Sequence, residues 1–75
     1  MKDRVKAIMA VTFRVDEKLL SDNVEQNDIV NWDSLAHLNL IIALENEFDI
    51  SFEPEEIRHM TSMNSIIKCI KSHKE

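Results

Sequence analysis

Apolar residues recur every three to four positions in several stretches of the chain, a spacing typical of α-helices that bury one face. The first predicted helix runs from about Lys2 to about Lys18, with apolar positions at Val5, Ile8, Met9, Val11 or Thr12, Phe13 and Val15. The second runs from Ser34 to about Phe48, with a core face of Leu38, Leu40, Ile41, Leu44 and Phe48.

A second stripe lies opposite the core face of this helix and consists of Leu35, Asn39, Ile42 and Asn46. Two large apolar residues on this stripe make the helix apolar nearly all round, which a helix with one solvent-facing side does not need. Either the helix is covered on all sides, or Leu35 and Ile42 contact a partner.

Two further helices are predicted in the C-terminal third of the chain. Pro54 suits the first position of a short helix that ends near His59, with core residues Ile57 and Met60. Thr61 or Ser62 caps a last helix to about Lys74, whose buried face is Met63, Ile66, Ile67 and Ile70.

Residues 21–33 are predicted to form a long loop, anchored in the core by Val24, Ile29 and Val30. The chain contains no glycine, so Asn and Asp are expected at left-handed backbone positions. Asp49, directly after the second helix, is one such position. The predicted fold is a single all-α domain of residues 1–75, a small four-helix bundle in which the third helix is short and a long loop joins the first two.

The charge distribution argues against a protein that binds nucleic acid. Residues 21–56 carry ten acidic residues and no Lys or Arg, a surface that repels nucleic acid and attracts basic partners. A DNA-binding helix-turn-helix protein needs a basic recognition helix, which is absent from Ser34–Phe48. No apolar run is long enough to span a membrane, and the single cysteine excludes an internal disulfide. We expect a cytoplasmic monomer that binds no nucleic acid.

The start of the second helix holds the strongest candidate site. Asp33 is a good N-cap residue, because its carboxylate can accept from free amides of the first turn. Ser34 then occupies the first helical position, where the amides and the helix dipole favour an anion. A hydroxyl in this place is suited to carry a phosphate ester.

The residues around this serine indicate a more specific class of protein. The segment Asp33-Ser34-Leu35, followed by a mostly apolar helix that ends in Ala43-Leu44-Glu45-Asn46-Glu47-Phe48, resembles the acyl carrier proteins. The resemblance implies that Ser34 bears a 4'-phosphopantetheine arm, derived from coenzyme A, whose thiol holds an acyl group as a thioester. It places Asp33 where the modifying phosphopantetheinyl transferase and its magnesium dock. It also implies a carrier and not an enzyme.

The same resemblance implies a partner surface beside the serine, made of Leu35, Ala36, Asn39, Ile42, Glu45, Asn46, Glu47 and Ile57. Its partners are acyl ligases, acyltransferases or ketosynthase-type enzymes with basic docking patches, in fatty acid, polyketide or related biosynthesis. Many carriers of general fatty acid synthesis have acids at the positions of Ala36, Asn39 and Asn46, which suggests a specialised member here. An aminoacyl or peptidyl carrier of the same fold, and an acidic helical interaction module without an arm, remain the alternatives.

Other candidate chemistry is weaker. His37 lies one turn from Ser34, but no third orienting group and no glycine-built oxyanion turn accompany the pair; no catalytic residue is predicted, and a half-buried structural role is expected for His37. Trp32 is expected to pack beneath the loop. Cys69 and His73 are one turn apart and could contact a metal, but the chain has no CxxC motif and the other histidines are far away in sequence, so no metal site is predicted.

Overall fold

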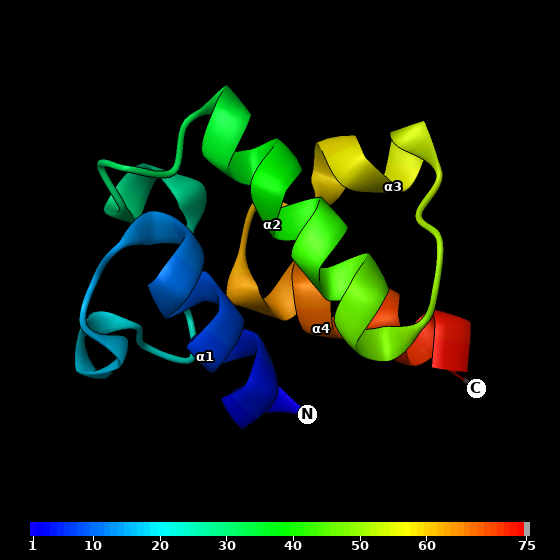
Figure 1. Cartoon of the computed structure of the whole chain (residues 1–75), viewed down its shortest axis with the longest axis horizontal. Coiled ribbons are helices and arrows are strands. Elements are labelled where there is room, and N and C mark those ends of the chain that lie inside the picture. The colour runs from blue at the N-terminus through cyan, green and yellow to red at the C-terminus, as the bar shows by residue number, and fades with distance from the viewer. Residues whose placement is uncertain (75) are drawn as a thin grey trace.

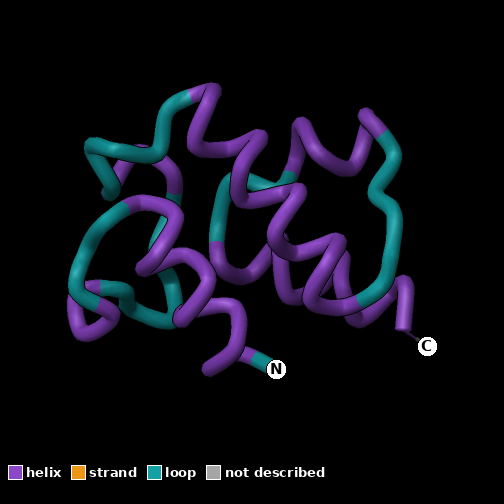
Figure 2. The backbone as a smooth tube through the Cα atoms, viewed as in Figure 1, coloured by secondary structure: helices purple, strands orange, loops and turns teal. Residues whose placement is uncertain are grey.

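The computed structural model describes residues 1–74, which form α-helices and short 3-10 helices (Figures 1 and 2). Their order is α1 (Lys2–Phe13), η1 (Glu17–Leu19), η2 (Gln26–Asp28), α2 (Ser34–Phe48), α3 (Pro54–His59) and α4 (Met63–Lys74). The predicted all-α four-helix bundle with a short third helix is confirmed. Within the described residues, no helix has the length and apolar character needed to cross a membrane.

Helix α1 ends at Phe13, five residues before the predicted end at Lys18. Arg14 takes the left-handed conformation (φ 57°), and its amide donates to the carbonyl of Ala10. The Asn31 side-chain amide caps the end of α1 by donating to the Phe13 carbonyl at 2.9 Å. The predicted boundary was wrong because this capping group comes from a distant part of the chain, and because Arg14, neither Asn nor Asp, takes the left-handed position.

The buried face of α1 also differs from the prediction. Val5, Met9 and Phe13, spaced four apart, are at most 1% exposed. Val11 is 80% exposed, so it lies outside the core. Residues four apart lie above one another on a helix, so only one row of the apolar residues of α1 faces the core.

The loop between α1 and α2 is anchored against the start of α4. The Gln26 amide donates to the Thr61 carbonyl, and the Met63 amide donates to the Val24 carbonyl, both at 2.8 Å. Val24 is buried as predicted, whereas Val30 is 98% exposed and does not reach the core. These backbone bonds fix the segment that leads into α2.

Helix α2 crosses the middle of the molecule in front of α4 (Figure 1). The residue after it, Asp49, takes the left-handed conformation (φ 54°), as predicted. Leu40, Ile41 and Leu44 are buried, but Leu38, also placed on the core face by the sequence, is 52% exposed. The exposed side of α2 is therefore more apolar than predicted.

Helices α3 and α4 begin with local caps. Pro54 is the first residue of α3, and the Glu56 side chain accepts from the Glu53 amide at 2.8 Å. The Ser62 hydroxyl accepts from the Ser65 amide at 3.1 Å, which confirms Ser62 as the cap of α4. Helix α3 has no fully buried residue. Ile57 packs against the core, which is closed beneath α3 by Met60, Met63, Ile66 and Ile70.

Candidate functional site

The first turn of α2 is organised by Asp33. Its backbone is extended, and its Oδ1 accepts from the Ala36 amide at 2.8 Å, so the predicted N-cap is confirmed. Ser34 is the first helical residue and is exposed. The cap leaves the Ser34 hydroxyl accessible at the positive end of a fifteen-residue helix.

Trp32 forms the base on which this turn rests. Its indole is 3% exposed and stacks on the Phe13 ring, with 4.8 Å between the ring centroids. The Gln26 side-chain amide donates to the Trp32 carbonyl at 3.1 Å. The expected packing of Trp32 beneath the loop is confirmed, and it ties the loop to the end of α1.

His37 connects this base to α3. The Trp32 indole N–H donates to His37 Nδ1 at 3.0 Å, and His37 Nε2 lies 2.9 Å from the carbonyl oxygen of Ile57. An indole nitrogen can only donate, so Nδ1 accepts and the proton is assigned to Nε2, which donates to Ile57. Both ring nitrogens are thus engaged away from Ser34, which gives His37 the structural role expected of it.

An exposed apolar stripe runs along α2 from the serine. Leu35 is 68% exposed, Leu38 52% and Ile42 48%, and Asn39 and Asn46 are exposed beside them. Three large apolar side chains left open on one helix are a feature of contact surfaces.

One member of the predicted partner surface is buried, and another is half-buried. Ala36 is only 9% exposed and belongs to the core, which corrects its placement on the surface. Ile57 is half-buried, and its carbonyl is occupied by His37. Helix α2 is turned so that the side of Ala36 faces inward, a rotation that the wide apolar arc left open.

The acids at the end of α2 are bonded within the chain. Glu45 is half-buried, and its Oε2 accepts from the Phe52 amide at 2.9 Å. Glu47 forms an ion pair with Arg4 of α1 at 2.7 Å. Both acids therefore have structural partners, so less of the charge near this stripe is free than the sequence indicated.

A mainly polar groove adjoins the first turn of α2. Its volume is about 450 Å³, and its lining includes Arg14, Asn31, Asp33, Leu35 and Asn39. Amide and guanidinium groups offer hydrogen-bond donors there. Asp33 and Leu35, the two neighbours of Ser34 in the chain, both line this groove.

No family model matches the chain. The chain is 34% identical over 73 residues to a protein of Clostridium acetobutylicum described as an acyl carrier protein, an alignment that covers 97% of this chain and 95% of that relative. The chain belongs to the acyl carrier protein family. Acyl carrier proteins normally carry phosphopantetheine and interact with biosynthetic enzymes, and they are not themselves enzymes.

Two features of this acyl carrier protein were not predicted from its sequence. Leu38 joins the exposed stripe, although its spacing placed it on the core face. Glu56 of α3 lies against Cys69 and His73 of α4, which the sequence had paired only with each other. No spacing rule relates Glu56 to α4, because the contact arises from the packing of two helices.

Proposed function

We propose that Ser34 is the attachment site of 4'-phosphopantetheine and that the chain is a carrier of acyl groups, not an enzyme. The observation that carries this proposal is the exposed hydroxyl at the first residue of α2, directly after the Asp33 cap. Membership of the acyl carrier protein family supports it. The attached group supplies a terminal thiol that holds an acyl group as a thioester.

The residues around Ser34 fit such a phosphate ester. Asp33 uses one carboxylate oxygen to cap the Ala36 amide, which fixes the first turn without covering the serine. The remaining free amides and the helix dipole stabilise a phosphate at this position. Asp33 is also the residue beside which the modifying transferase and its magnesium would dock.

The arm beyond the phosphate is itself polar and contains amide groups. Arg14, Asn31 and Asn39, which line the groove beside Ser34, are the residues that would hold it. The Asn31 amide already donates to the Phe13 carbonyl, so its remaining capacity lies in its second N–H and its oxygen. Arg14 and Asn39 are exposed and free to adjust.

The partner surface that we propose comprises Leu35, Leu38 and Ile42, with Asn39 and Asn46 at its edge. Since Glu45 and Glu47 are bonded within the chain, apolar contact contributes more to docking here than charge. The partners are a phosphopantetheinyl transferase and acyl ligases, acyltransferases or ketosynthase-type enzymes of fatty acid, polyketide or related biosynthesis. We place the carrier in the cytoplasm as a monomer. Aminoacyl or peptidyl cargo is the alternative for the same arm.

The test is intact-mass analysis after incubation with coenzyme A and a broad-specificity phosphopantetheinyl transferase. The wild-type chain should gain one phosphopantetheine, and Ser34→Ala should gain none. Ser51→Ala, which changes another exposed serine, is the matched control and should be modified like the wild type. A wild-type chain that stays unmodified while a second carrier is loaded in the same mixture contradicts the proposal and favours the interaction module.

A further inference from the structure

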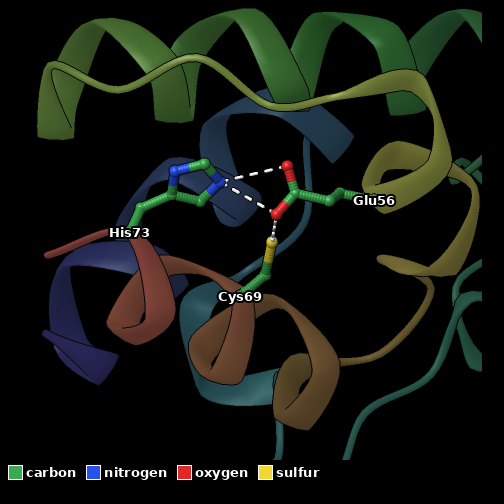
Figure 3. Close-up of side chains that lie close together, drawn as sticks. All are labelled: Glu56, Cys69 and His73. Carbon is green, nitrogen blue, oxygen red and sulfur yellow. Dashed lines mark hydrogen bonds and ion pairs between the residues drawn. The ribbon is translucent and has the colours of Figure 1, made fainter. Parts of the chain in front are cut away.

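Three side chains with different donor atoms converge where α3 packs on α4 (Figure 3). Cys69 and His73 lie one turn apart on α4, and Glu56 reaches them from α3. Glu56 Oε2 is 3.1 Å from Cys69 Sγ and 2.8 Å from His73 Nε2. One sulfur, one nitrogen and one oxygen atom all lie within 4.8 Å of one another.

These three atoms are the ligand types that Zn²⁺ takes in proteins. A tetrahedral zinc ion, with bonds of about 2.0–2.3 Å, places its ligand atoms roughly 3.3–3.6 Å apart. The distances from Glu56 Oε2 to its two neighbours need to open by only about 0.5 Å to reach that spacing. The other oxygen of Glu56, Oε1, accepts from the Glu53 amide that caps α3 and also lies 3.0 Å from His73 Nε2.

The charges of the cluster also suit a divalent cation. The hydrogen bond from the Glu53 amide, followed by that from the Cys69 thiol, lowers the pKa of Glu56, so this carboxyl group is ionised. Burial, and then the neighbouring carboxylate, raises the pKa of Cys69 to about 12, so binding of a cation to the sulfur has to displace the thiol proton against this shift. A thiolate and a carboxylate together neutralise two positive charges, and the imidazole adds none.

The surroundings leave room for a fourth ligand. A groove of about 390 Å³ opens beside the cluster, and its lining includes Glu56, Cys69, His59 and Ser72. Water can reach the cluster through this groove. Three protein ligands and one open position are an arrangement that zinc accepts.

We propose that Glu56, Cys69 and His73 bind one zinc ion, with water as the fourth ligand, in a site that ties α3 to α4. On binding, the Zn–S bond forms as the S–H bond of Cys69 breaks, and the proton goes to solvent. The Glu56 carboxylate and the neutral His73 imidazole each donate an electron pair to the ion. No oxidation or reduction takes place. The site uses none of the residues around Ser34, so it does not depend on the proposed carrier role.

The test uses Co²⁺ as a spectroscopic substitute for Zn²⁺. All measurements use the full chain with Ser34→Ala, so that no phosphopantetheine thiol can bind the metal. One Co²⁺ per chain should bind with a thiolate-to-cobalt charge-transfer absorption, and one equivalent of Zn²⁺ should remove that absorption. Zn²⁺ should also raise the thermal unfolding midpoint, because a ligand that binds only the folded state stabilises it.

Variants made in the Ser34→Ala chain distinguish Co²⁺ binding at this site from binding to surface carboxylates. Cys69→Ser should abolish the charge-transfer absorption, and His73→Gln should weaken Co²⁺ binding about tenfold or more. His59→Gln, which changes a histidine lining the same groove, is the matched control and should bind like its parent. His73 is in the last turn of α4, so its variant tests the site even if Cys69→Ser does not fold.

The proposal is wrong if Co²⁺ binds without a thiolate absorption. It is also wrong if Cys69→Ser and His73→Gln both retain the parent affinity, an outcome that would assign the metal to surface carboxylates. Failure of Ser34 modification in the mass experiment has no bearing on these outcomes.

Discussion

Two histidines from different helices contact α3 at adjacent residues, Ile57 and Glu56, and their surroundings differ in kind. His37 of α2 bonds to the Trp32 indole and the Ile57 carbonyl, which are neutral groups. His73 of α4 faces the Glu56 carboxylate, which also accepts from the Cys69 thiol. The first link fixes one tautomer and is complete in itself. The second brings together a carboxylate, a thiol and an imidazole, the three groups that we propose as zinc ligands.

The same residue type thus contacts a neutral carbonyl at Ile57 and a carboxylate at the adjacent Glu56 of one short helix. Helix α3 has six residues and none is fully buried, so these links add to the packing of Ile57 against the core. The link through His37 sits above the core formed by Trp32 and Phe13. The link through His73 lies at the edge of the molecule, close to the last residues of α4.

The largest expected effect comes from removing the support of the first link. Trp32→Ala deletes a buried indole, its stacking on Phe13 and the donor to His37, and should cost about 3–5 kcal/mol of unfolding free energy. Such a loss is a large part of the stability of a small domain. Urea unfolding followed by circular dichroism measures it. A cost below about 1 kcal/mol would show that the base beneath Ser34 is not fixed as described.

Trp32→Phe is the control for this change, because it retains an aromatic ring beside Phe13 but removes the N–H donor. The cost should fall to about 1–3 kcal/mol, the range for a buried polar group that loses its partner. His73→Gln should cost less than Trp32→Phe, since His73 is at the partly exposed end of α4. Equal losses of unfolding free energy in His73→Gln and Trp32→Phe would contradict the difference between the two links.

A smaller effect is expected on the choice of partner enzymes, which involves only the residues of α2 near Ser34. If this is a specialised carrier, the form bearing the arm should be a poor substrate for malonyl loading and elongation by a general fatty acid synthase. Asn39→Glu/Asn46→Glu should improve it, since each exposed charge pair adds about 0.2–1 kcal/mol, which for two pairs is at most roughly thirtyfold in affinity. Ala36→Asp is left out because Ala36 is buried.

Two outcomes would count against specialisation. The wild type could already match a housekeeping carrier in loading and elongation, or the double variant could bring no gain. The control is cobalt binding at Glu56, Cys69 and His73, which both asparagine changes should leave unaltered because those residues lie on the other link.

The smallest effect concerns the pH dependence of the second link. The pKa of Glu56 is lowered, first by the hydrogen bond from the Glu53 amide, so its ionised form stabilises the fold above the ordinary pKa of glutamate. That contribution is lost as the pH falls through the lowered value. Glu56→Gln should therefore be less stable than the wild type at neutral pH, by less than about 1 kcal/mol, and equal to it in acid. Urea unfolding across this range checks the change, and a constant difference at every pH would contradict it.

Local signals in the sequence predicted the parts of the fold that local chemistry decides. Asp33 before an apolar helix, Asp49 after it and Ser62 before α4 all act as predicted, because a cap bonds to amides or carbonyls a few residues away. The end of α1 could not be predicted in this way. Its last carbonyl is bonded by Asn31, eighteen residues further along the chain.

The candidate site also has a part that local sequence predicted and a part that it did not. Asp33 and Ser34 could be placed from a short motif, whereas the side of α2 that faces solvent could not. Ala36 and Leu38 exchanged their predicted environments, since an apolar arc this wide fits the core in more than one rotation. The cluster of Glu56 with Cys69 and His73 needed the packing of α3 on α4, which no periodicity contains.

The base beneath Ser34 also gives this chain a built-in optical reporter. The sequence has one tryptophan and no tyrosine, so intrinsic fluorescence excited in the near ultraviolet comes almost wholly from Trp32. Its indole is buried, stacked on Phe13 and bonded to His37, two residues before the serine. Events at the first turn of α2 can therefore be followed by emission wavelength, quenching and anisotropy, without attaching a dye to a protein so small that a dye would alter it.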